Sequence, residues 1–213
     1  MIIEQPSTWL RWLYPSAIWR MPHKEKSVYL TFDDGPIPEA TPFILNVLDK
    51  YGVKATFFMV GDNVRKYPYL KEEIEKRGHR LGNHTYNHVG GFGCSSKEFL
   101  RNTYKADQLI HSHLFRPPRG WMQWAQYIRL RKKFTIIMWD VVTRDYSRLI
   151  TADEVVDNVK RYTRNGSIIT FHDSLKSIDK LKTALPESIE WLKDQGYEFR
   201  IFEADQQRSR HLK

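Results

Sequence analysis

The chain has 213 residues, of which 41% are hydrophobic and 28% charged, the balance of an ordinary globular protein. Lys and Arg outnumber Asp and Glu by 34 to 25, and this net charge of +9 favours acidic partners or an anionic membrane surface. Aromatic residues make up 14%, which excludes a disordered chain. The single cysteine, Cys94, excludes an intrachain disulfide framework and a thiolate-rich structural zinc site.

The N-terminal 22 residues lack the charged head and clean apolar run of a secretory signal, and no apolar stretch has the length of a membrane span. We therefore expect a cytoplasmic protein. A peripheral position at the inner membrane face stays open, although packing of this segment on the domain is favoured. The residues that would contact lipid are Trp9, Trp12, Tyr14, Trp19, Arg11 and Arg20.

Short β-rich runs alternate with longer helical patterns. Strands are predicted at residues 27–32, 54–60, 79–83, 134–139, 167–171 and 197–202, with an extended segment at 115–118. Helices are predicted at residues 39–51, 62–78, 95–113, 151–162 and 181–195, with another helical stretch between 118 and 134. Ser95 with Glu98, and Thr151 with Glu154, have the spacing of a capping box. This alternation predicts one α/β domain with a mainly parallel sheet, either doubly wound or closed into a barrel.

Polar residues gather where the predicted strands end. These residues are Asp33, Asp34, His84, His88, Arg116, Asp140, Asp145, His172 and Asp173. Parallel strands bring their C-terminal ends to one face, which carries the site in barrels and in open sheets alike. The sequence therefore predicts a single polar cluster.

Two of these features together suggest a metal site. His84 and His88 are four residues apart, so on a helical turn both imidazoles would project to one side. With Asp33 or Asp34 they would supply three ligands and leave other positions for water and substrate, as in catalytic metal sites. Taken separately, the histidines could be a surface pair, and the Asp-Asp-Gly-Pro sequence a turn held by its own side chains. Their shared position at strand ends favours the metal.

Other candidates are weaker. Cys94 is interpreted as a small loop thiol. The basic run at residues 129–133 is interpreted as a solvated helix face, so no nucleic-acid partner is expected. Trp121 and Trp124 could stack on a sugar ring or pack against a neighbouring helix.

Five motifs carry a family resemblance. They are TFDDG at residues 31–35, HTYNH at 84–88, RPPRG at 116–120, Asp145-Tyr146, and FHD at 171–173. In this order they resemble the polysaccharide deacetylase family, metal-dependent carbohydrate esterases that include chitin and peptidoglycan N-deacetylases. The resemblance spans residues 28–202 and implies a single-domain distorted (β/α) barrel of about seven strands, similar to a TIM barrel.

The resemblance also implies roles. Asp33 would be the general base, held by Arg116, and His172 the general acid, paired with Asp145. The metal ligands would be Asp34, His84 and His88. The expected reaction is removal of an N-acyl group, acetyl above all, from an amino sugar or glycan by metal-activated water. Zinc is favoured as the divalent ion, with cobalt, nickel, manganese and iron left open.

The chain departs from the family pattern near the site. Val142 and Tyr146 stand where the family commonly has Asp and Trp, and Thr170 stands where it has Leu. Tyr146 and Thr170 would make the acyl pocket more polar. Arg119 would either bind an anionic substrate or be solvated. The substrate-binding residues implied are Tyr146, Thr170, Pro118 and Arg119.

Other functions remain open at this stage. The same chemistry could act on a lipid- or nucleotide-linked sugar, or the scaffold could be a weakened sugar-binding protein. An iron oxygenase with two histidines and a carboxylate is disfavoured by the α/β pattern. The domain organisation expected is an N-terminal extension packed on the domain (1–26), a deacetylase-like catalytic domain (27–204) and a basic tail (205–213).

Overall fold

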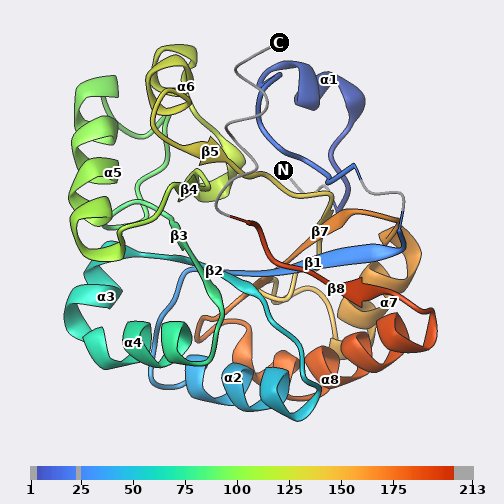
Figure 1. Ribbon diagram of the computed structural model, residues 1–213. Helices are drawn as coiled ribbons and strands as arrows, with labels where there is room; N and C mark the ends of the chain where they lie inside the picture. Colours follow the sequence, from blue (N-terminus) through green and yellow to red (C-terminus); the bar gives the residue numbers. More distant parts are fainter. Residues whose placement is uncertain (1–3, 23–24, 204–213) are drawn as a thin grey trace.

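The computed structural model describes residues 4–22 and 25–203, so the predicted basic tail lies outside the described residues. Seven parallel strands follow one another in the order β5-β4-β3-β2-β1-β7-β6, and β8 adds to β1. The strands are β1 (Ser27–Asp33), β2 (Thr56–Met59), β3 (Arg80–Asn83), β4 (Leu114–Phe115), β5 (Thr135–Ile136), β6 (Val141–Val142), β7 (Ser167–His172) and β8 (Glu198–Phe199). The sheet curls into a half-barrel (Figure 1), which confirms the predicted distorted barrel.

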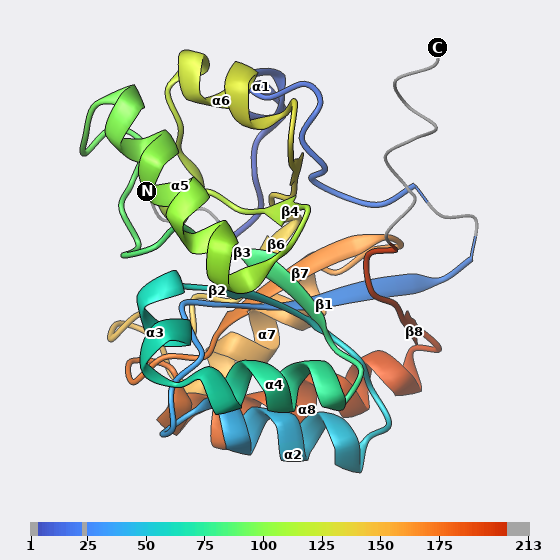
Figure 2. The same ribbon diagram turned by 60° about the vertical axis from the view of Figure 1, so that its left-hand side comes forward.

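The helices lie on both sides of this sheet. They are α1 (Thr8–Trp12), α2 (Thr41–Lys50), α3 (Gly61–Lys66), α4 (Pro68–Lys76), α5 (Ser96–Ile110), α6 (Trp124–Leu130), α7 (Ala152–Tyr162) and α8 (Ile178–Asp194). Figure 2 shows α2, α4, α7 and α8 below the sheet and α1, α5 and α6 above it. Thr151 and Glu154 form the predicted capping box of α7, and the Ser95 hydroxyl accepts the Glu98 N–H at the start of α5.

One predicted helix is wrong in extent. Residues 62–78 form two helices, because α3 ends at Lys66 and α4 begins at Pro68. Proline has no N–H to donate and disfavours helical backbone in the residue before it, and Tyr67 has φ −129° and ψ 58°. The apolar periodicity continues across this break, so it suggests one helix where the backbone makes two.

The predicted strand at residues 134–139 is also different in the structure. An extended stretch from Thr135 to Val142 first pairs with β4, as β5, and then with β7, as β6. The backbone N–H of Ile137 donates to Phe115, and that of Asp140 donates to Ile168. This single stretch therefore links the two ends of the strand order.

Two apolar layers hold the sheet. Below it, Phe32 stacks on Phe57 and Phe171 at ring-centroid distances of 5.1 and 5.8 Å, within a cluster that includes α2, α7 and α8. Above it, a second cluster joins Leu10 and Tyr14 to α5 and α6. Every residue of β1 is buried, which explains why the parallel strands read as continuous apolar runs.

The N-terminal segment is tied to the barrel by Asp140. This fully buried carboxylate accepts hydrogen bonds from Arg11 (2.7 Å), Arg164 (2.7 and 2.9 Å) and Ser167 (2.8 Å). Because the Asp140 N–H pairs with Ile168 near the start of β7, Asp140 lies away from the strand ends that the sequence pattern assigned to it. In the described part of the chain, no helix has the length and hydrophobicity needed to cross a membrane.

Candidate active site

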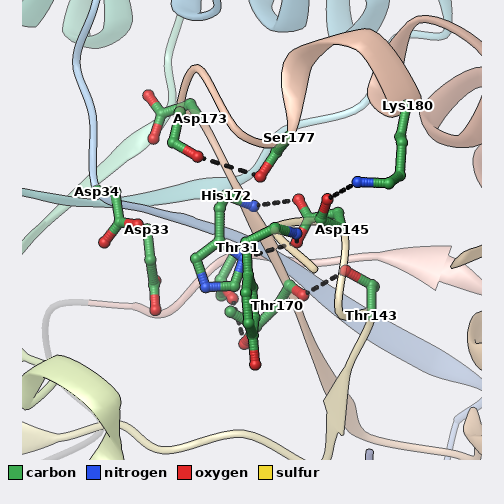
Figure 3. Close-up of polar contacts among 12 residues, drawn as sticks. Thr31, Asp33, Asp34, Thr143, Asp145, Thr170, His172, Asp173, Ser177 and Lys180 are labelled. Carbon is green, nitrogen blue, oxygen red and sulfur yellow. Dashed lines mark hydrogen bonds and ion pairs between the residues drawn. The ribbon is translucent and has the colours of Figure 1, made fainter. Parts of the chain in front are cut away.

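The pairing of β1 with β7 places two predicted site residues side by side. In the parallel register Asp33 lies opposite His172, at the C-terminal ends of the two central strands (Figure 3). Asp34 follows with φ +84°, a left-handed conformation that turns the chain sharply at the strand end. The polar residues of the first motif thereby leave the sheet at the face where parallel strands end.

Arg116 is the buried anchor of Asp33. Its guanidinium lies over the ring of Phe58, and the Arg116 side chain is only 1% exposed. Nη1 donates to Asp33 Oδ1 at 2.7 Å and lies within hydrogen-bond distance of the hydroxyls of Thr31 (2.8 Å) and Thr170 (3.1 Å). The remaining guanidinium nitrogens donate to backbone carbonyls, so the group is held on every side.

Asp34, His84 and His88 form the predicted metal-ligand group. Their potential ligand atoms all lie within 4.8 Å of one another. Asp34 Oδ1 is 3.1 Å from His88 Nε2 and 3.7 Å from His84 Nε2. The helical turn expected for the two histidines is wrong: residues 84–88 form a bend in which Thr85 and His88 have φ of +66° and +57°. The left-handed residues, rather than a helical repeat, bring the imidazoles to one side.

The surroundings of this group fit a divalent cation. Asp34 Oδ1 is buried and has no hydrogen-bond partner among the described residues, although both Nε2 atoms face it. His84 Nδ1 contacts the Arg116 carbonyl at 2.8 Å, which places its proton on Nδ1 and leaves the Nε2 lone pair free for a metal. Burial lowers the pKa of His84 to about 4, which keeps the ring neutral.

The carboxylate of the group is ionised. Burial alone would raise the pKa of Asp34, but the close contact with His88 and the charges of nearby histidines lower it well below its usual range. A carboxylate oxygen and two imidazoles are the donor set of many zinc centres.

His172 and Asp145 form a tight pair next to this group. His172 Nδ1 lies 2.7 Å from Asp145 Oδ1, and the His172 backbone N–H donates to Asp145 Oδ2 at 2.7 Å (Figure 3). Burial lowers the pKa of His172, but the charge and hydrogen bond of Asp145, with the charges of Asp34 and Asp33, raise it to about 9. The imidazole is therefore protonated at neutral pH, with Nε2 left to donate.

The four predicted substrate-binding residues differ in their exposure and in their contacts. Tyr146 is 39% exposed, and its ring meets the His172 ring edge-on at 4.7 Å between centroids. Thr170 is buried beneath the site, with its hydroxyl turned to Thr31 and Arg116, so its polarity is engaged there. Pro118 is buried, whereas Arg119 is exposed in the turn after Arg116.

Several supporting contacts were not predicted, although Asp173 itself was named at a strand end. The Asp173 carboxylate accepts from the Gly35 N–H (2.8 Å) and the Thr41 hydroxyl (2.9 Å), holding the turn after Asp34, and a Cβ on Gly35 would lie 1.8 Å from it. Asn63 donates to the Asp34 carbonyl and Lys180 to the Asp145 carbonyl, both at 2.8 Å. Thr31 could have been found, because it lies two residues before Asp33 and so on the same face of the strand.

The remaining candidates lie outside the site. Cys94 is half-buried, and burial raises the pKa of its thiol, as expected of an unreactive loop cysteine. Trp121 is half-buried against the upper apolar cluster, whereas Trp124 is 57% exposed.

Comparison with known proteins identifies the family. The sequence matches the polysaccharide deacetylase family over residues 20–129. It is 32% identical, over 189 residues, to a peptidoglycan-N-acetylglucosamine deacetylase of Bacillus cereus, covering 85% of this chain and 88% of the relative. It is 35% identical, over 155 residues, to a chitooligosaccharide deacetylase of Sinorhizobium fredii, covering 69% of this chain and 72% of the relative.

The fold agrees with this relationship. The crystal structure of the Bc1960 peptidoglycan N-acetylglucosamine deacetylase superimposes with a TM-score of 0.84 at 32% identity, covering 92% of this chain and 94% of the other. The chain belongs to the polysaccharide deacetylase family, as the five motifs predicted. The two relatives named above are deacetylases of glycans, peptidoglycan in one case and chitooligosaccharides in the other.

Proposed function

We propose that the protein is a metal-dependent hydrolase that removes the N-acetyl group from amino-sugar residues of a glycan. The observation that carries this proposal is the meeting of three units at one face of the sheet: a buried Asp33–Arg116 pair, a protonated His172–Asp145 pair and a three-ligand group. A sugar-binding protein would need none of these proton-transfer pairs.

The metal would be held by Asp34, His84 and His88. A divalent cation there supplies Lewis acidity, polarising the amide carbonyl and acidifying a water molecule. Zinc suits the donor set, and cobalt, nickel, manganese or iron would also be accepted by it.

Asp33 would act as the general base. Arg116 binds its Oδ1, which fixes the carboxylate and leaves Oδ2 to accept the proton of the attacking water. The guanidinium is itself fixed by two backbone carbonyls, so the base keeps its orientation while its protonation state changes.

His172 would act as the general acid. An amine leaves a tetrahedral intermediate poorly unless it is protonated, and His172 carries a proton at neutral pH because Asp145 stabilises its cation. The C–N bond then breaks, the nitrogen takes the proton from Nε2, and acetate and a free amino sugar are released.

The test is acetate release from N-acetylglucosamine oligomers and from peptidoglycan, with and without added zinc. We expect metal-dependent release that Asp33→Asn lowers by about a hundredfold to ten-thousandfold while the metal stays bound. Asp179→Asn, at a carboxylate that is 87% exposed, is the matched control and should be unaffected. Bound metal without any acetate release from these glycans would contradict the proposal and direct the search to lipid- or nucleotide-linked sugars.

A further inference from the structure

Helix α1 has two apolar sides, and only one of them is covered. Leu10 and Tyr14 are 3% exposed and pack into the upper apolar cluster. Trp9, Trp12 and Leu13 follow the i, i+3, i+4 spacing along the other side, with 51, 75 and 41% of their surfaces exposed. Large apolar side chains that are exposed together on one side of a helix mark an interaction surface.

Helix α6 packs beside α1 through buried rings and adds a further exposed indole, that of Trp124, which is 57% exposed. The Trp124 ring lies 5.2 Å from the ring of Tyr127, and Tyr127 lies 5.2 Å from Tyr14 at the end of α1. The Tyr127 hydroxyl also contacts Ser16, and the Arg131 guanidinium lies 5.8 Å over the Tyr127 ring. Figures 1 and 2 both place α1 and α6 at the end of the molecule farthest from α2 and α8.

The two segments that carry α1 and α6 have positive charges and no negative ones. Residues 5–22 and 108–139 contain no Asp or Glu. Arg129, Arg131 and Lys132 are exposed, and none of them pairs with an acidic side chain in the part of the chain that is described. Exposed indole rings next to unpaired cations are complementary to a surface that is apolar inside and anionic outside.

We propose that this aromatic–basic face (Trp9, Trp12, Leu13, Trp124, Arg129, Arg131 and Lys132) binds peripherally to a bilayer of anionic phospholipid. Lipid is favoured over a soluble polyanion because a polyanion would satisfy the cations but leave Trp12 and Leu13 in water. The inference concerns a surface separate from the active site and does not depend on the deacetylase proposal.

The proposed face is also connected to a segment next to the candidate active site. The loop of residues 89–95 follows His88, a proposed metal ligand, and packs on the start of α6, where Gln123 and Gln126 donate to the Gly91 carbonyl at 3.1 and 2.8 Å. This loop is therefore fastened to the helix that carries Trp124 and Arg129.

Co-sedimentation with vesicles tests the proposal, using phosphatidylcholine alone and equal parts of phosphatidylcholine and phosphatidylglycerol. We expect binding to the mixed vesicles only, weakened by salt, with a blue shift of tryptophan fluorescence. The variant Arg129→Gln/Arg131→Gln/Lys132→Gln should lower the partition coefficient by about a hundredfold. The variant Trp9→Ser/Trp12→Ser should abolish most of the blue shift and lower binding by about tenfold or more.

Matched controls replace exposed residues elsewhere: Lys160→Gln/Arg161→Gln/Lys182→Gln for the charges and Tyr69→Ser for the aromatic surface. Both should bind within about threefold of wild type. Circular dichroism would confirm that all variants fold. Absence of vesicle binding, equal loss in the controls, or binding to polyphosphate as tight as to vesicles without a fluorescence shift would overturn the proposal.

Discussion

Arg116 shows how a single side chain organises the site. Its Nη1 lies against the carboxylate of Asp33 and the hydroxyls of Thr31 and Thr170, all within 3.1 Å and all out of solvent. The two threonines come from adjacent strands, β1 and β7, and are partners in the sheet register. The position of Asp33, the proposed general base, therefore depends on hydroxyls that act through Arg116.

We expect Thr170→Val to lower kcat by about fivefold with little change in KM, because Arg116 loses one buried acceptor and Asp33 loses part of its fixed orientation. Thr170→Ser keeps the hydroxyl and should restore kcat. Steady-state kinetics on soluble oligomers measures both. A valine variant as active as the serine variant would show that the contact has no positioning role.

The pH profile should report the His172–Asp145 pair. The proposed general acid, His172, would act in its protonated form, so activity should be lost as pH rises through its pKa, which the structure raises to about 9. Asp145→Asn removes the charge that opposes the effect of burial, so the alkaline limb of kcat/KM should move to lower pH and kcat should fall. An alkaline limb that stays in place would assign it to another group. Asp179→Asn replaces a carboxylate that is far more exposed than that of Asp145, and it should leave the pH profile unchanged.

The grouping of the candidate site residues could be predicted from the sequence because each of them stands in a short motif near a strand end. The contacts that support it could not be predicted, because those of Thr170 and Asp173 join residues that lie between 54 and 139 positions apart in the sequence. Thr170 was expected to line an acyl pocket, yet its hydroxyl is engaged with Arg116 and Thr31. The local sequence around a residue does not show which neighbours its side chain will contact.

At the scale of elements, Asp140 joins the N-terminal segment, the barrel and the end of α7. Its carboxylate is fully buried, whereas the side chains of Arg11 and Arg164 are 25 and 43% exposed. Removing the charge leaves both arginines able to find water, so the loss is smaller than for a fully buried pair.

We expect Asp140→Asn to lower the free energy of unfolding by about 2 kcal/mol in urea at neutral pH. Asp179→Asn, in an exposed pair with Lys182, should change it by less than about 0.5 kcal/mol. Burial raises the pKa of Asp140, but Arg164, Ser167 and Arg11 outweigh it and lower the pKa. This stabilisation is therefore present above the unfolded pKa and lost as pH falls through the folded one, so the difference between variant and wild type should shrink in acid.

Element boundaries followed from the sequence where capping and turn residues marked them, as at Thr151 of α7. The predicted boundaries were wrong where backbone geometry interrupted the apolar periodicity. Pro68 divides a continuous apolar pattern into two helices. The segment from Thr135 to Val142 pairs first with β4 and then with β7, which are not adjacent in the sheet. The second case depends on sheet curvature, which no local pattern encodes.

At the scale of the whole molecule, metal binding should raise the free energy of unfolding. An ion that binds only the folded state at a concentration a hundredfold above its Kd adds about 2.7 kcal/mol, so zinc should raise the Tm and a chelator should lower it. His88→Asn should abolish the zinc-dependent rise. His111→Asn is the matched control, because both histidines have left-handed backbone (φ +57° and +55°) that asparagine tolerates. An equal zinc response in the two variants would place the ion elsewhere.

The central position of β1 has a consequence for synthesis. The proposed base and all three proposed metal ligands lie within residues 33–88, whereas the proposed acid arrives with β7, which completes the other side of β1. A nascent chain emerging from the ribosome would thus carry its cation-binding residues well before it could donate a proton to a leaving group. Hydrolytic competence is then acquired late, when the last third of the chain closes the sheet against a strand made near the beginning.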